Sequence, residues 1–273
     1  MTREAELGRA LDGLRERVAR AAEAAGRDAD DIELLPVTKF FPAADVAALY
    51  RLGCPAFGES RDQEAAAKVS EVDTLVGGAP VQWHMIGRIQ RNKARSVARW
   101  AYAAHSVDSA KVIAALDRAA AEALDEGGRT APLRVYLQIS LDGDESRGGV
   151  DVAASDRIDE LCAAIDGAGG LEFVGLMAIP PLNADAGEAF ARLERERDRI
   201  QAGYRQRLGL SAGMSGDLEA AIRHGSTCVR VGTALLGSRP LTSPAVVTRV
   251  TQSSQTPNLP HFPESSPHEG SSQ

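Results

Sequence analysis

Leu34-Leu35-Pro36-Val37-Thr38-Lys39 is a short apolar run that ends in a single lysine. Pro36 lies within the run, and Phe40-Phe41-Pro42 follows it, so no regular element continues past this point. A short apolar run bounded by such breakers predicts a buried strand. Lysine is rarely buried without a partner. Lys39 is therefore either a surface residue at the mouth of a sheet or a functional amine, and the rest of the chain decides between the two.

Apolar runs and amphipathic helices alternate along most of the chain. Before the lysine run, Leu7, Leu11, Leu14 and Val18 recur at spacings of four, three and four, which predicts a helix that ends near Gly26. The predicted strands cover residues 33–38, 56–60, 81–87, 101–107, 133–140, 171–179, 210–214 and 227–231. Eight strands that alternate with helices predict an α/β fold, a single (β/α)8 TIM-type barrel. Since little helical sequence follows the eighth strand, we expect the first helix to close the barrel.

The sequence changes character after Pro240. Ser, Pro, Thr and Gln dominate residues 251–273, and the periodic apolar positions disappear. Such a composition is typical of disordered segments, because it buries too little apolar surface to offset the entropy lost on ordering. We therefore expect a barrel domain at residues 1–240 and a Ser/Pro-rich, disordered tail at residues 241–273.

Composition narrows the classes of partner. The chain has 273 residues, a net charge of −7 and 44% hydrophobic residues, which suits a globular protein and argues against nucleic acid or an anionic membrane as the main partner. The three cysteines are scattered, with no C-x-x-C pair, which indicates reduced thiols and a cytoplasmic location. No apolar stretch reaches membrane-spanning length, and the charged amino terminus leads into a helical pattern unlike a signal peptide.

Two late loops carry the residues that an anion site needs. Barrels of this type build their sites at the carboxyl ends of the strands, and the loops after strands seven and eight commonly hold phosphate. Gly213-Met214-Ser215-Gly216-Asp217 follows the seventh predicted strand, and Arg230-Val231-Gly232-Thr233 ends the eighth. Glycines let backbone N–H groups approach an anion closely, and hydroxyls add further donors. Together the loops favour a phosphate site over the alternative that they only make tight turns and cap a helix.

A lysine and a phosphate site in one barrel mouth suit two chemistries. Lys39 could form a Schiff base with the carbonyl of a sugar phosphate or with the aldehyde of pyridoxal 5′-phosphate (PLP). Arg230 bears on the choice, because its guanidinium cannot be deprotonated and would leave a facing pyridine nitrogen unprotonated, which makes the ring a weak electron sink. The alternative is that Arg230 forms an ion pair with Glu59, Asp217 or Glu219.

Several segments form long, specific motifs that span nearly the whole chain to Gly237. The most specific is Trp83-His84-Met85-Ile86-Gly87-Arg88-Ile89-Gln90-Arg91-Asn92-Lys93. The others are Val37-Thr38-Lys39, residues 57–64 (FGESRDQE), residues 175–180 (GLMAIP), and residues 210–215 (LSAGMS) through 229–234 (VRVGTA). Together these segments resemble the pyridoxal phosphate homeostasis protein family, a set of small fold-type-III barrels related to the amino-terminal domain of alanine racemase.

The resemblance implies a role for each matching position. Lys39 would carry PLP as an internal aldimine, and Arg230 would approach the pyridine nitrogen. The phosphate would be held by Ser215, Gly232 and Thr233. The ring would be lined by His84 and Met177, and Ser60 stands where the family motif has a residue that reaches further toward the ring. No residue is assigned a catalytic role, and no metal ligand is expected.

The resemblance also bears on activity. Racemases of this fold use a tyrosine from a separate carboxyl-terminal domain as a second base, whereas the tyrosines of this chain, at positions 50, 102, 136 and 204, fall on barrel elements. We therefore expect a monomeric PLP carrier and buffer that is not an enzyme and whose recipients are PLP-dependent apo-enzymes. A low-activity PLP-dependent amino-acid racemase and a Schiff-base aldolase acting on sugar phosphates remain as alternatives.

The predicted helix at residues 89–100 is rich in basic residues. Arg88, Arg91, Lys93 and Arg95 fall within or just before its first turns. Such a run is either a patch for an anion or partner, or a solvated helix face, and the second is the more usual.

Overall fold

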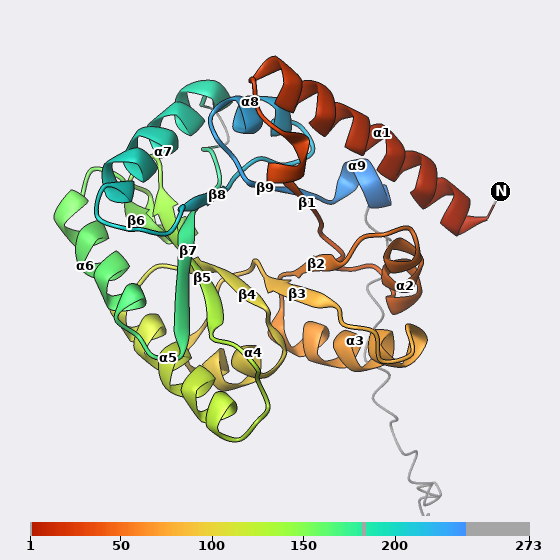
Figure 1. Ribbon diagram of the computed structural model, residues 1–273, viewed down its shortest axis with the longest axis horizontal. Helices are drawn as coiled ribbons and strands as arrows, with labels where there is room; N and C mark the ends of the chain where they lie inside the picture. Colours follow the sequence, from red (N-terminus) through yellow and green to blue (C-terminus); the bar gives the residue numbers. More distant parts are fainter. Residues whose placement is uncertain (1, 182–183, 239–273) are drawn as a thin grey trace, which may run out of the picture. The chain divides into compact units, whose positions relative to one another are not determined.

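The computed structural model describes residues 2–181 and 184–238 of the chain, and helices and strands alternate through this part (Figure 1). The strands are β1 (Glu33–Pro36), β2 (Ala56–Glu59), β3 (Gln82–Met85), β4 (Ala103–Val107), β5 (Leu133–Ser140), β6 (Val150–Asp151), β7 (Leu171–Ala178), β8 (Gly209–Ser211) and β9 (Cys228–Val231). The helices are α1 (Arg3–Ala24), α2 (Ala43–Arg51), α3 (Asp62–Leu75), α4 (Ala94–Trp100), α5 (Ala110–Asp125), α6 (Ser155–Asp166), α7 (Ala186–Gln201), α8 (Leu218–Arg223) and α9 (Thr233–Leu236).

The sheet is a parallel barrel. Its strands follow the order β1-β9-β8-β7-β5-β4-β3-β2, and a parallel bridge between Val37 and Gly58 joins the two ends, β1 and β2. The short β6 pairs only with β5 and lies off this path. The predicted (β/α)8 barrel is therefore confirmed, and the carboxyl ends of all eight barrel strands meet at one mouth.

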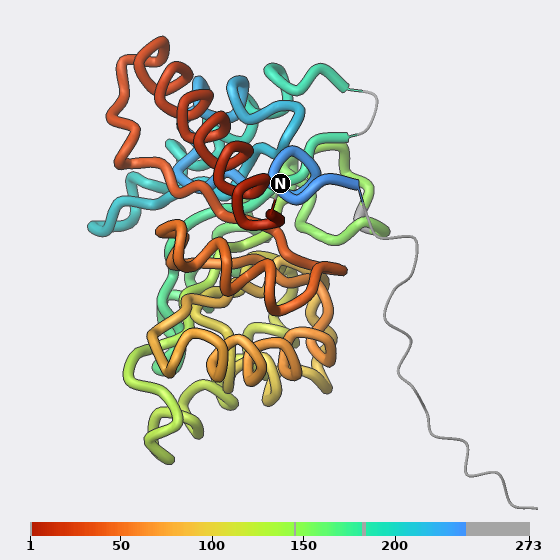
Figure 2. Tube along the Cα trace, turned by 90° about the vertical axis from the view of Figure 1, so that its right-hand side faces the viewer, coloured from red at the N-terminus to blue at the C-terminus, as the bar shows by residue number. Residues whose placement is uncertain are grey.

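The first helix packs on the barrel as its pattern predicts. Leu7, Leu11, Leu14 and Val18 are buried in one apolar cluster that also contains Leu235 of α9. α1 contacts α2, α8 and α9, and Figures 1 and 2 show it beside the end of the described chain. Because α9 has only four residues, α1 covers the flank that a full-length final helix would otherwise cover.

Some boundaries differ from those predicted. The basic segment begins with a 3₁₀ turn, η2 (Arg91–Lys93), before α4 starts. α7 ends at Gln201, whose side chain donates to the carbonyls of Tyr204 and Gln206 and accepts from the Leu208 amide, which replaces helical bonds in the segment that follows. Ser109 occupies the N-cap of α5, and its side chain makes no cap hydrogen bond with a described residue.

Two further findings concern the predicted tail and membrane-spanning helices. The predicted tail at residues 241–273 lies outside the described residues. In residues 2–181 and 184–238, no helix is both long enough and apolar enough to cross a membrane.

Candidate functional site

A cavity of about 480 Å³ opens at the carboxyl ends of the barrel strands. Lys39 lines it after β1 and Ser60 after β2, while Met177 lines it from within β7. The loops after β8 and β9 contribute Ser215 and residues 232–233. The cavity is thus at the end of the barrel where the sequence predicts the site, and its volume lies in the usual range for small-molecule sites.

Lys39 lies in a tight turn at the end of β1. The Phe41 amide donates to the Thr38 carbonyl at 3.0 Å, so Lys39 and Phe40 are the central residues of a β-turn. Phe40 has a φ of 71°, a left-handed conformation that turns of this type normally give to glycine or asparagine. Holding an aromatic residue there costs roughly 1–3 kcal/mol, so the surroundings must determine this turn strongly.

A buried ion pair behind the turn holds the turn in this conformation. Lys68 Nζ of α3 donates to the Thr38 carbonyl oxygen at 2.9 Å and to Glu59 Oε1 at 2.7 Å, and Thr38 Oγ1 donates to the same Glu59 oxygen at 2.7 Å. The Glu59 side chain is fully buried, and that of Lys68 is 11% exposed. Since the Thr38 carbonyl belongs to the peptide that leads into Lys39, this pair fixes the backbone that presents the lysine.

Backbone amides and one hydroxyl at the mouth form an anion cradle. Ser215 Oγ accepts from the Ala234 amide at 3.3 Å, which ties the loop after β8 to the loop after β9. In the described part of the chain, the amides of Ser215, Gly216, Gly232 and Thr233 donate no hydrogen bond. A side chain added at Gly216 would meet nothing within 4 Å. These donors and this space fit a phosphate group, which accepts several N–H bonds at once.

Arg230 is a buried cation held by neutral acceptors. Its guanidinium donates to the Ser211 carbonyl at 2.7 Å, to Ser211 Oγ at 2.6 Å and to the Ala178 carbonyl at 2.9 Å. Burial lowers the pKa of Arg230, but an arginine remains charged in any ordinary protein setting. Among the described residues it pairs with no carboxylate. The alternative ion pairs that the sequence left open are not formed.

The three carboxylates that could have paired with Arg230 have other partners. Glu59 accepts from Lys68, Glu219 from Arg17, and Asp217 from the Met214 amide. Arg230, which lines the cavity, therefore keeps its charge available to an electron-rich atom of a ligand, such as a ring nitrogen.

His84 lies beneath the cavity in a buried hydrogen-bonded chain. His84 Nδ1 and His105 Nε2 are 2.9 Å apart, and His105 Nδ1 is 2.7 Å from Ser211 Oγ, the atom that Arg230 contacts. His84 Nε2 is 3.7 Å from Glu33 Oε1. One direction fits the two hydrogen bonds: Ser211 donates to His105, and His105 donates to His84. His84 Nε2 then carries a proton on the side of Glu33 but makes no hydrogen bond among the described residues. His84 thus supports Arg230 through two intermediaries.

Comparison with known proteins identifies the family. The family model described as "Alanine racemase, N-terminal domain" matches residues 10–240. The chain is similar to the pyridoxal phosphate homeostasis protein of Mycobacterium tuberculosis (strain H37Rv), at 59% identity over 89% of this chain and 96% of the relative. The chain belongs to the pyridoxal phosphate homeostasis protein family. The membership inferred from the sequence motifs is therefore confirmed.

More distant members of the pyridoxal phosphate homeostasis protein family agree. The Escherichia coli (strain K12) protein of that name is 36% identical over 84% of this chain and 95% of its own length. A solved structure of PipY from Synechococcus elongatus PCC7942, with PLP bound, superposes with a TM-score of 0.70 at 32% identity, covering 85% of this chain and 100% of that one.

The structure brings most of the predicted site residues of this family member together. Seven of them line the one cavity: Lys39, Ser60, Met177, Ser215, Arg230, Gly232 and Thr233. The eighth, His84, is 2% exposed and is not among the lining residues. Sequence reasoning did not assign several polar residues that also line the cavity, namely Arg88, Ser106, Gln138 and Arg147. Their signal was a polar residue near the end of a predicted strand or in the loop after it.

The buried histidines make stability depend on pH. Burial lowers the pKa of His84 to about 3 and the pKa of His105 well below its ordinary value. Below pH 6.5 the unfolded chain therefore binds protons that the folded chain does not, so the free energy of unfolding should fall as the pH falls. We expect a loss of about 2 kcal/mol per histidine between pH 7 and pH 5, measured by urea unfolding.

Two comparisons isolate the histidine contribution. A His84→Gln variant should show a shallower dependence between pH 7 and pH 5, whatever its stability at pH 7. Glu33, whose pKa is raised by burial, acts in the opposite sense, so the Glu33→Gln variant should show a steeper fall. An identical slope in the wild type and in His84→Gln would contradict the assignment.

Proposed function

We propose that this chain binds PLP at the barrel mouth with Lys39 as the point of covalent attachment, and that it carries and buffers the cofactor without robust catalysis. One observation carries the proposal. Lys39, the one lysine among the described residues that line the cavity, shares that space with the amide cradle and with Arg230. These are the three groups needed for an aldehyde, a phosphate and a ring nitrogen.

Each group has a task in holding the cofactor. Lys39 supplies the amine, Ser215 and the amides at 215–216 and 232–233 bind the phosphate, and Arg230 donates toward the ring nitrogen. Met177 offers an apolar contact, buried within β7, for the ring. When bound, PLP supplies an aldehyde that reacts with an amine and a ring that withdraws electrons. The permanent charge of Arg230 leaves no acid to protonate the ring nitrogen, which limits that withdrawal.

The composition of the cavity wall supports a carrier over a racemase. Among the described lining residues there is no Asp, Glu, His, Tyr or Cys to serve as a second proton donor or acceptor beside Lys39. Tyr136 packs against His105 inside the barrel, with the two rings tilted by 34°, and burial raises the pKa of Tyr136 far above the ordinary value. It is therefore poorly placed to exchange protons with a substrate.

Exposed apolar side chains at the cavity rim bear on which proteins receive the cofactor. Ile179 and Met214, each 39% exposed, both line the cavity. Exposed apolar side chains at a mouth favour contact with another protein, and PLP-dependent apo-enzymes are the class that would take the cofactor.

We further propose that the protein is a monomer and that it is cytoplasmic. The three cysteines are free and buried, and burial raises the pKa of Cys54 to about 11, which suits reduced thiols.

A transfer experiment tests the proposal. Cofactor-loaded protein is mixed with an apo-aminotransferase in the presence of a phosphatase that destroys free PLP, and the recovered aminotransferase activity is followed. We expect the wild type to protect and deliver the cofactor, and Lys39→Ala to deliver none. In parallel, α-proton exchange of alanine in D₂O should not exceed that of free PLP. Exchange at an enzymatic rate would overturn the carrier assignment in favour of a racemase.

A further inference from the structure

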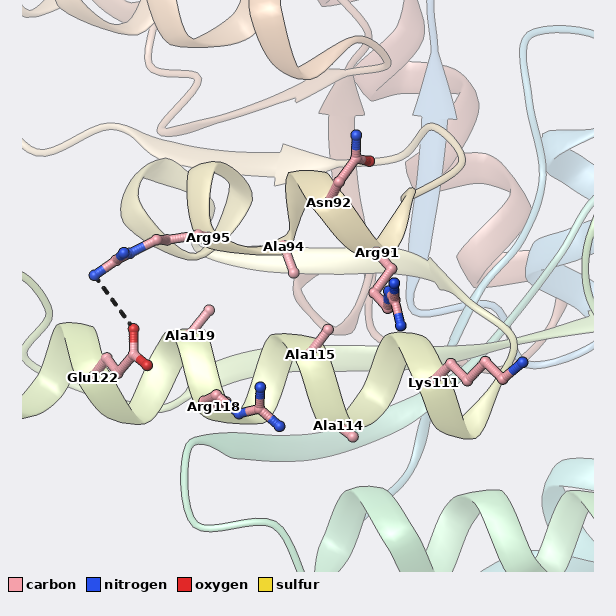
Figure 3. A pocket seen from close by; sticks show the side chains of 10 residues that line it. All are labelled: Arg91, Asn92, Ala94, Arg95, Lys111, Ala114, Ala115, Arg118, Ala119 and Glu122. Carbon is pink, nitrogen blue, oxygen red and sulfur yellow. Dashed lines mark ion pairs between the residues drawn. The ribbon is translucent and has the colours of Figure 1, made fainter.

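A second concave site lies on the flank of the barrel, between η2 and α4 on one side and α5 on the other (Figure 3). It is a groove of about 510 Å³, and none of the described residues that line it also lines the mouth cavity. Four alanines make its apolar surface, at positions 94, 114, 115 and 119. Their small side chains leave room for a ligand close to the helix backbones.

The groove gathers positive charge from two helices. Arg91 approaches α5 from η2, while Lys111 and Arg118 come from α5 itself (Figure 3). All three are exposed, and none of their side chains makes a hydrogen bond or an ion pair with any described residue. A solvated helix face would spread such charges outward, and in a chain of net charge −7 three unpaired cations around one hollow are unusual. Their mutual repulsion would be relieved by an anion.

One carboxylate sits in the groove and marks its far end. Glu122 of α5 lies 3.5 Å from Arg95 of α4, and this ion pair spans the groove (Figure 3). The neighbouring Lys93 does not join the cluster, because it lies 3.8 Å from Asp62. The groove is therefore positive along most of its length, and Glu122 is the one acidic residue among the described residues that line it.

The side chains of the groove indicate the class of anion. Among the described residues that line it there is no aromatic side chain, so it lacks the stacking platform that bases use, which disfavours nucleic acid. Arginine binds phosphate through paired N–H donors, lysine binds it as a point charge, and Asn92 adds an amide. The positive charge of three unpaired cations exceeds the negative charge that one phosphate group carries. We propose that this groove binds a small anion with two or more phosphate groups. This site is independent of the cofactor site at the mouth.

Calorimetric titration of the full chain with inorganic pyrophosphate tests the proposal. The titration is made on protein as purified and on protein saturated with PLP, so that binding at the mouth is separated from binding in the groove. We expect one site that persists when PLP is bound, and an affinity that falls steeply with salt. Orthophosphate should bind at least about tenfold more weakly, because it reaches fewer of the cations.

Variants assign the heat to the groove. Arg91→Gln/Lys111→Gln should weaken pyrophosphate binding about tenfold or more, since each substitution removes a charge-assisted hydrogen bond. Glu122→Gln should tighten binding, because it removes the opposing carboxylate and frees Arg95. The matched control is Arg20→Gln/Arg223→Gln, which removes two basic residues from another groove that α1 and α8 line. It should leave binding unchanged.

Three results would overturn the proposal. They are no saturable binding to the PLP-loaded protein, binding that Arg91→Gln/Lys111→Gln leaves unchanged, and binding that the control variant weakens equally. Arg91 and Lys111 are exposed and make no side-chain contact with a described partner, and the ion pairs of Arg20 with Glu16 and of Glu122 with Arg95 lie at the surface. Far-UV circular dichroism should therefore confirm that each variant stays folded.

Discussion

Replacing Lys68 with methionine should lower the free energy of unfolding by about 3–5 kcal/mol, because it leaves a buried carboxylate without its cation. Glu59 is fully buried, and its Oε2 accepts no hydrogen bond in the described structure even in the wild type. Without Lys68, Oε1 keeps only the Thr38 hydroxyl, and the Thr38 carbonyl keeps only the Phe41 amide. The loss should be measured by urea unfolding at pH 7.

A second substitution at Glu59 gives a signature that simple loss of packing would not. Glu59→Gln removes the buried carboxylate that Lys68→Met leaves without its cation. The double variant Lys68→Met/Glu59→Gln should therefore be more stable than Lys68→Met alone. Lys111→Met is the matched control, because Lys111 is exposed and without a partner among the described residues; it should change stability by at most about 0.5 kcal/mol. A double variant no more stable than Lys68→Met would contradict the role given to Glu59.

The same substitution should disturb the lysine at the mouth. Lys68 holds the peptide that leads into the strained turn of Lys39 and Phe40. Because methionine cannot donate a hydrogen bond to the Thr38 carbonyl, we expect the affinity for PLP to fall, while Lys111→Met should bind PLP like the wild type. PLP affinity unchanged in a destabilised Lys68→Met variant would show that the ion pair stabilises the barrel without positioning Lys39.

Gly175→Ala should destabilise the protein by about 2–5 kcal/mol, from two causes that add. Gly175 lies in β7 with a φ of 148°, which an L side chain rarely adopts. A Cβ there would also overlap the backbone carbonyl of Gly209, the residue that pairs with it in β8. Separating β7 from β8 would displace both Met177 and Ser211, so PLP binding should weaken as well.

A second glycine provides a control, because its replacement should change the free energy of unfolding in the opposite direction. Gly13 is exposed within α1, and a Cβ added there would meet nothing within 4 Å. Gly13→Ala should therefore raise the free energy of unfolding by about 0.5–1 kcal/mol, because alanine favours a helix more than glycine does. Thermal or urea unfolding of both variants checks the pair. A stable Gly175→Ala with wild-type PLP affinity would show that the barrel accommodates the overlap.

The sequence predicted the barrel because each strand is a short apolar run between breakers, and the lysine and glycine loops follow from where those strands end. The sequence does not show how deep a side chain lies inside the barrel. Alternation along β3 places His84 inside, but only the packing shows that it lies beneath Arg230, in contact with His105. The partner of Lys68 was equally hidden, since Glu59 and Lys68 lie on different elements.

The basic segment shows the same limit. Its basic residues can be read from the sequence, but whether they form a binding site depends on which helix packs against them. Arg91 gains its significance because η2 and α4 pack on α5, which brings Lys111 and Arg118 to the same groove. The expectation of a disordered tail at residues 241–273 stays a prediction.

Borohydride reduction of the full-length protein after incubation with PLP, followed by peptide mass spectrometry, tests most directly whether Lys39 binds the cofactor. We expect one pyridoxyl group, on the peptide that contains Lys39. In Lys39→Ala that modification should be absent, whereas Lys111→Met should be modified like the wild type. Modification spread over surface lysines, or none on Lys39, would contradict the assignment of the mouth cavity as the cofactor site.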